Sequence, residues 1–422
     1  MYRKAVLDGG ITVVTERIPF VRSVSFGAWI RNGSRNEGGA HGGISHFIEH
    51  MLFKGTGKRT AKMIADEMDA VGGQLNAYTT KEYTCFFART LDSHFDVALD
   101  IISDMIVDPR FDEAEIEKEL NVILEEINMV EDSPEDLLHD LLEERVYAGS
   151  DLALPVLGAK ESVAAVDRGA FLEYYDKNYH PENAVLAVAG NFDPDDALKK
   201  IAEAFAGFKR GSAYKKPELS AVYHPVRAVR EKDIEQVHIA FGFPSVGSGT
   251  DETYPLLILN TVFGGGMSSR LFQKIREENG LSYSIYSHNS SFTGCGLFSV
   301  CAALAANQLE RTAELIMEEI GRLFTDRITD DTLRKTKEQI KSNYMLSLES
   351  SASRMSSMGR SELMLGRVLP PEELIEKIDA VDLNAIYDIA ERVFIGSNMS
   401  TAAVGSVSED DLRKFARPGG FY

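Results

Sequence analysis

Cysteine is scarce in this chain, and long apolar runs are missing. Only three cysteines occur among 422 residues, Cys85, Cys295 and Cys301, and all have apolar or small neighbours. An odd, sparse set favours buried thiols in a reducing compartment over a disulfide framework. No apolar run approaches the roughly 20 residues that a membrane-spanning helix needs, so no membrane partner is expected. The apolar stretch 5–7 is also too short for a signal-peptide core.

Basic charge is also in deficit. The 45 Lys and Arg residues stand against 65 Asp and Glu residues, which gives a formal net charge of −20. Nucleic acid is therefore not an expected partner, because phosphate binding requires a basic surface. A hydrophobic content of 44% with 26% charged residues is typical of a globular protein. The length of 422 residues exceeds what one ordinary core supports, so two or more domains are expected.

The two halves of the chain look like weak copies of each other. Residues 24–30 and 237–243 both have the composition of a buried strand. Each is followed by a polar loop and then by an apolar helical segment, at 44–53 and 254–263. A strand pair, a long helix, an Asp-rich break and another long helix follow in both halves. This pattern predicts an α+β protein with two duplicated domains, each an antiparallel sheet covered by helices on one face.

A change of composition separates the two copies. The segment from about 205 to 235 contains several Gly, Pro, Lys and Arg residues and lacks helical periodicity. We therefore predict a first domain at 1–212, a linker at 213–223 and a second domain at 224–422.

Three ionisable residues interrupt the apolar helix at 44–53: His46, Glu49 and His50. At about 100° per residue the two histidines lie about 40° apart, with Glu49 close to both. Their neighbours are Ile, Phe, Met and Leu, so the helix is expected to be buried, where such groups need partners or a metal. Histidines at i and i+4 can bind one Zn²⁺, and His-x-x-Glu-His is an inverted form of the common zinc-protease motif. The alternative is a pair of core histidines beside a salt-bridged glutamate.

The corresponding helix of the second half carries no such set. Its residues Leu259–Phe263 cannot bind a metal in the same way, so one Zn²⁺ per chain is expected.

A catalytic zinc needs a third protein ligand, and the helix predicted at 112–130 offers one. Its apolar residues recur with the spacing of one buried helical face. Glu119 and Glu126 lie seven residues apart at the edge of that face, whereas Glu125 points away from it. The geometry thus favours Glu126 over Glu125. The alternative is an ordinary solvated glutamate beside a buried stripe.

Taken together, the segments Gly43–Met51 and Glu117–Glu126 resemble the pitrilysin/insulinase family of inverted-motif zinc metallopeptidases. The likeness extends over essentially the whole chain and is closest to the short two-domain branch, with bacterial processing proteases and the mitochondrial processing peptidase β-subunit. The resemblance implies a zinc-dependent endopeptidase with His46, His50 and Glu126 as zinc ligands. It implies Glu49 as the catalytic base and Glu119 as a supporting residue.

The resemblance also implies where substrate binds. The segment Gly72–Thr80, with Asn76 and Ala77, matches the region that leads to a strand whose edge pairs with the peptide. In the second half, Arg276 and Tyr283 match an Arg and a Tyr that contact the substrate backbone near the scissile bond. A tyrosine hydroxyl is a suitable donor to a developing oxyanion. The alternatives are an ordinary turn for Asn76–Ala77 and a solvated helix arginine for Arg276.

In this family two chains, or two fused ones, close around a chamber. A homodimer is therefore expected, with Arg276 and Tyr283 acting on the zinc site of the partner chain, and with unstructured peptides as substrates. Two other functions stay open: a non-catalytic scaffold or peptide-binding subunit of the same family, and a zinc hydrolase acting on another amide. The Met1 start without a transit segment favours a cytoplasmic, bacterial protein.

Overall fold

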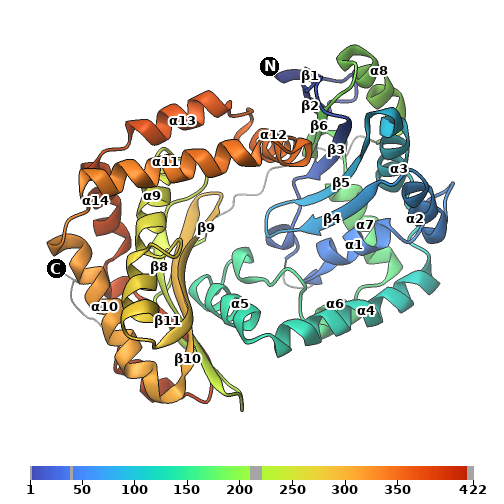
Figure 1. Ribbon diagram of the computed structural model, residues 1–422. Helices are drawn as coiled ribbons and strands as arrows, with labels where there is room; N and C mark the ends of the chain where they lie inside the picture. Colours follow the sequence, from blue (N-terminus) through green and yellow to red (C-terminus); the bar gives the residue numbers. More distant parts are fainter. Residues whose placement is uncertain (1, 39–40, 210–220, 416–422) are drawn as a thin grey trace. The chain divides into compact units, whose positions relative to one another are not determined.

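The computed structural model describes residues 2–38, 41–209 and 221–415. The chain divides into two compact units, each built on one β-sheet (Figure 1). The first unit comprises Met1–Ile127, Leu154–Glu218 and Met345–Leu369, and the second comprises Asn128–Ala153, Leu219–Tyr344 and Pro370–Tyr422.

The first unit contains a six-stranded sheet in the order β1-β2-β6-β3-β5-β4. Neighbouring strands are antiparallel except for β2 and β6, which are parallel. Strand β4 is at one edge and pairs only with β5 within this sheet. The strands are β1 (Tyr2–Val6), β2 (Thr12–Arg17), β3 (Ser23–Ile30), β4 (Gln74–Thr79), β5 (Thr84–Leu91) and β6 (Ala184–Gly190).

Helices cover both faces of the first sheet. One face carries the main core, to which α1, α3 and α7 contribute buried residues. The opposite face is covered by α12, which packs on β2, β3 and β6. Gly359 permits that approach, because a Cβ atom there would lie 2.4 Å from the Trp29 ring. The helices of this unit are α1 (Ile44–Leu52), α2 (Ala61–Ala70), α3 (Phe95–Val107), α4 (Glu113–Asp132, up to Ile127), α6 (Lys160–Ala164), α7 (Arg168–Asn178), α8 (Pro194–Ala204) and α12 (Ser351–Leu365).

The second unit repeats this plan with a five-stranded sheet in the order β7-β11-β8-β10-β9. Only β7 and β11 are parallel. The strands are β7 (Arg227–Glu231), β8 (Gln236–Ser245), β9 (Ser282–Phe292), β10 (Cys295–Ala305) and β11 (Ser400–Gly405).

Its main core lies between one sheet face and helices that include α9, α10 and α14, and α5 packs on the other face. The helices are α5 (Pro134–Val146), α9 (Thr253–Phe263), the π-helical segment η6 (Phe272–Glu278), α10 (Leu309–Thr325), α11 (Asp330–Ser347, up to Tyr344), α13 (Pro371–Ala380), α14 (Leu383–Val393) and α15 (Glu409–Arg413).

The predicted α+β class and the duplication are confirmed: β3 and α1 of the first unit correspond to β8 and α9 of the second. Two details differ from the expectation. Each sheet contains one parallel pair, and each carries a helix on its second face as well. The reason lies in β6 and β11, which are buried at every position. A strand without an exposed face requires cover on both sides of its sheet.

The compact units do not follow the predicted domain boundaries at every point. Helix α5 comes from the first half of the chain but buries Leu138 and Leu142 on the second sheet. Conversely, α12 comes from the second half of the chain but packs on the first sheet. Most of the linker predicted at 213–223 lies outside the described residues. No disulfide joins the three cysteines. No helix within the described part of the chain has the length and apolar character needed to cross a membrane.

Candidate active site

The start of helix α1 is fixed by a buried carboxylate. Gly43 adopts φ = 92° just before the helix, and a Cβ atom there would lie 2.5 Å from the Leu157 carbonyl oxygen. The backbone N–H groups of Gly43 and Ser45 donate to the two oxygens of Glu37, at 2.7 and 2.8 Å. Burial raises the pKa of Glu37 to about 7 against the opposing effect of these hydrogen bonds. The α1 residues that follow therefore have a defined position.

His46 and His50 present their ring nitrogens to each other. Their Nε2 atoms are 3.2 Å apart, and their side chains are only 12% and 17% exposed. Burial, assisted by the proximity of His50, lowers the pKa of His46 to about 3. The His46 ring is therefore neutral at ordinary pH, the form in which an imidazole binds a metal.

Glu126 of α4 completes a triangle of ligand atoms. Its Oε2 lies 3.5 Å from Nε2 of His50 and 3.7 Å from Nε2 of His46. A tetrahedral Zn²⁺ with bonds of about 2.0–2.1 Å sets its ligand atoms roughly 3.3 Å apart, close to these separations. The neighbouring Glu125 is exposed. Two imidazoles and one carboxylate are also the donor types of a catalytic zinc, so the three residues fit such an ion.

Glu119 sets the orientation of His50. Its Oε1 accepts from Nδ1 of His50 at 2.9 Å, and its Oε2 forms an ion pair with Lys54 at 2.5 Å. Because Nδ1 carries the hydrogen in this contact, the lone pair of His50 lies on Nε2 and points toward His46 and Glu126. A carboxylate in this position typically fixes the tautomer of a metal-binding histidine.

Glu49 has the environment of a catalytic base. Its carboxylate is buried and accepts a hydrogen bond from the Thr79 hydroxyl. Burial raises the pKa of Glu49 above that of an ordinary glutamate. A carboxylate with raised proton affinity is a better proton acceptor near neutral pH than a solvated one.

Asn76 and Ala77 lie on the edge strand β4, whose last residue is the Thr79 that contacts Glu49. The Ala77 N–H donates to the side chain of Asn76 at 2.8 Å. The β4 edge of the first sheet thus ends beside the candidate catalytic carboxylate.

Arg276 and Tyr283 belong to the second unit, whereas His46, His50 and Glu126 belong to the first. They contact each other: the Arg276 guanidinium lies over the Tyr283 ring, 4.5 Å from its centroid. Arg276 comes from η6, and Tyr283 is near the start of β9 with 79% of its surface exposed.

Three contributors to the site were not predicted from the sequence: Glu37, Lys54 and Thr79. Lys54 follows His50 by four residues, so helical spacing could have placed it on the same face. No sequence signal links Glu37 or Thr79 to the residues that they contact.

Two family models match the chain. Residues 12–160 match the family described as insulinase (peptidase family M16), and residues 165–340 match the peptidase M16 inactive domain. The uncharacterized zinc protease YmxG of Bacillus subtilis is 41% identical over 397 residues, which cover 93% of this chain and 96% of that protein. An uncharacterized zinc protease of Streptomyces coelicolor is 36% identical over 417 residues, covering 96% of this chain and 90% of that protein.

Solved structures show the same fold. A protease from Helicobacter pylori superposes with a TM-score of 0.90 at 20% identity, over 96% of this chain and 99% of that one. A Pseudomonas fluorescens protein, described as a peptidase M16 inactive domain, also has a TM-score of 0.90, at 18% identity over 96% and 98% of the two chains. The chain is therefore a short two-domain member of the pitrilysin/insulinase family of peptidases, family M16.

Proposed function

We propose that this chain is a zinc-dependent endopeptidase that hydrolyses unstructured peptides or small polypeptides. The observation that carries the proposal is the triangle of His46, His50 and Glu126 with the buried Glu49 on the same helix as both histidines. The relatives named as zinc proteases support the same chemistry.

Each residue has a defined task in this proposal. His46, His50 and Glu126 would hold the zinc, which when bound supplies a Lewis acid and lowers the pKa of a water to about 7. Glu119 holds the His50 ring in the tautomer that exposes Nε2. Glu49 takes the proton from the attacking water and delivers it to the leaving amine nitrogen.

The edge of β4 would hold the substrate as an added strand. Backbone hydrogen bonds to an edge strand provide affinity without reading side chains, which suits a peptidase for many sequences. The Ala77 N–H of this strand already donates a hydrogen bond to the Asn76 side chain. A peptide that accepts a hydrogen bond from the Ala77 N–H would therefore displace the Asn76 side chain.

A comparison of substrates tests this function. An unstructured peptide with a quenched fluorophore should be cleaved at internal bonds, whereas the same sequence held within a stably folded protein should resist. Strand addition explains the difference, because only an extended chain offers free backbone groups. A panel of small non-peptide amides serves as the control. Hydrolysis of those amides without cleavage of the peptide would contradict the proposal.

We further propose that the chain acts as a homodimer, in which Arg276 and Tyr283 of one chain serve the zinc centre of the other across a closed chamber. The exposure of Tyr283 and its contact with Arg276 support this role, because the pair presents a guanidinium and a hydroxyl together. Both groups can donate to a substrate carbonyl oxygen.

Mixing of variants tests the dimer. Glu49→Gln and Tyr283→Phe homodimers should each be weak, but subunit exchange should pair Glu49 of one variant with Tyr283 of the other. Random exchange of a symmetric dimer predicts recovery of about a quarter of the wild-type rate, measured as peptide cleavage. Glu49→Gln mixed with the double variant Glu49→Gln, Tyr283→Phe is the control and should recover nothing. Equal, low rates in both mixtures after proven exchange would place Tyr283 in its own chain's site.

A further inference from the structure

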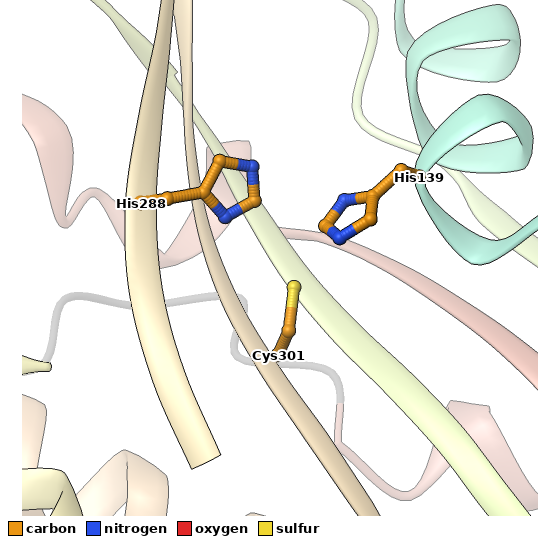
Figure 2. A group of neighbouring side chains, drawn as sticks. All are labelled: His139, His288 and Cys301. Atoms are coloured by element: carbon orange, nitrogen blue, oxygen red, sulfur yellow. The ribbon is translucent and has the colours of Figure 1, made fainter. Parts of the chain in front are cut away.

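A second group of metal-binding side chains lies entirely within the second unit. His139 of α5, His288 of β9 and Cys301 of β10 each offer one ligand atom, and these atoms lie within 4.8 Å of one another. The two imidazole rings are 4.9 Å apart between centroids. Figure 2 shows both rings and the Cys301 sulfur turned toward a common point.

The strand periodicity explains why the three side chains meet. Cys301 pairs with Tyr286 across β9 and β10, and His288 follows Tyr286 by two residues, so all three share one sheet face. That face is the one covered by α5. His139 follows Leu138, which is buried against the same face.

Hydrogen bonds hold one histidine and leave an atom of the other without a partner. Nε2 of His139 lies 3.0 Å from the Tyr286 hydroxyl, which donates to Oε1 of Glu135 at 2.5 Å. Nδ1 of His288 is buried and has no hydrogen-bond partner within the described part of the chain. A buried polar atom without a partner costs free energy, so a metal ion bound to this nitrogen would remove that cost.

We propose that His139, His288 and Cys301 form a second zinc site, which joins helix α5 to the sheet of the second unit. Two imidazoles and a thiolate are a donor set that binds Zn²⁺, with a fourth position left for water. Zinc binding replaces the thiol proton of Cys301, which is released to solvent. The hydrogen bonds from His139 to Tyr286 and from Tyr286 to Glu135 orient the His139 ring. Carboxylates commonly orient metal-binding histidines in this way.

Other roles for the cluster fit less well. Burial raises the pKa of the Cys301 thiol to about 12, so without a metal it is neither a nucleophile nor a reactive redox group. The cluster shares no residue with the His46 centre, and its existence would raise the zinc content from the expected one ion per chain to two. Its test is therefore independent of peptidase activity.

Cobalt substitution provides that test in the full-length chain. Co²⁺ bound by a thiolate gives a near-ultraviolet charge-transfer band, and the His46 centre contains no cysteine. Metal-free wild type titrated with Co²⁺ should develop this band, and one added equivalent of Zn²⁺ per site should remove it. Absence of the band in the wild type would overturn the proposal.

Variants assign the band to one thiol. Cys301→Ser should lose it, whereas Cys85→Ser and the same-strand control Cys295→Ser should retain it. Tyr286→Phe should weaken Zn²⁺ binding about 10-fold, the range typical for loss of a group that orients a ligand. Should Cys301→Ser not fold, His288→Asn replaces it, with an expected loss of at least about 100-fold in Zn²⁺ affinity. A band that persists in Cys301→Ser, or unchanged Zn²⁺ affinity in His288→Asn, would refute the site.

Discussion

Glu126→Gln should strip zinc from the His46 centre and abolish peptide cleavage. The amide keeps the size of the side chain but removes the negative charge from an oxygen that lies 3.5 Å from His50 and 3.7 Å from His46. Loss of a group that merely supports a ligand costs roughly 10–100-fold in metal affinity, so loss of a ligand should cost at least about 100-fold. Zinc content by mass spectrometry and cleavage of a quenched peptide measure the two effects.

The control is Glu125→Gln, one residue earlier on the same helix. Glu125 is exposed, so this variant loses the same charge without touching the centre and should keep wild-type zinc content and rate. Both variants are best compared in a Cys301→Ser chain, where zinc at the second proposed site does not contribute to the count. Full zinc and a normal rate in Glu126→Gln would remove Glu126 from the ligand set.

Glu49→Gln should lower kcat by roughly 10²–10⁴-fold, the usual contribution of a positioned general base. Glutamine can still accept the hydrogen bond from Thr79 but has no affinity for the proton of water, so structure and substrate binding should be preserved. We expect zinc content and KM near the wild-type values. Steady-state kinetics on the quenched peptide, with zinc measured on the same sample, provides the data.

Two outcomes of the Glu49→Gln experiment would contradict its assigned role. A rate close to wild type would show that another group accepts the proton. Loss of zinc together with activity would make Glu49 a ligand or a structural residue. The lost activity of Glu49→Gln would then not be evidence for base catalysis.

Much of the candidate metal centre was predictable because helical geometry acts over short distances along the sequence. The spacing of His46, Glu49 and His50 places all three on one helix face. The seven-residue interval from Glu119 to Glu126 places both at the edge of a buried stripe of α4. In the structure Glu119 and Glu126 both lie against His50, whereas the exposed Glu125 does not.

The remaining contacts depend on tertiary structure and leave no local signal. Thr79 meets Glu49 only because the edge strand β4 packs beside α1, and Glu37 contacts the start of that helix from a position outside it. The second cluster has the same character. His139, His288 and Cys301 are too far apart in sequence to form a motif, and none of them lies on α9, the helix that corresponds to α1.

The duplication was visible because strands and helices recur in the same order in both halves. The exchange of α5 and α12 was not, since an amphipathic pattern shows that a helix buries one face but does not say on which sheet. The continuous apolar composition of β6 did carry information about cover on both faces. The prediction of a sheet covered by helices on one face did not draw on this segment.

Zinc content and peptide cleavage, measured together on purified wild type and Glu49→Gln, test the central claim most directly. We expect the same zinc content in both proteins and cleavage of the quenched, unstructured peptide by the wild type only. A wild-type protein that holds no zinc at the His46 centre and cleaves nothing would contradict it. The chain would then be a non-catalytic member of its family, with His46 and His50 as residues of the helix packing.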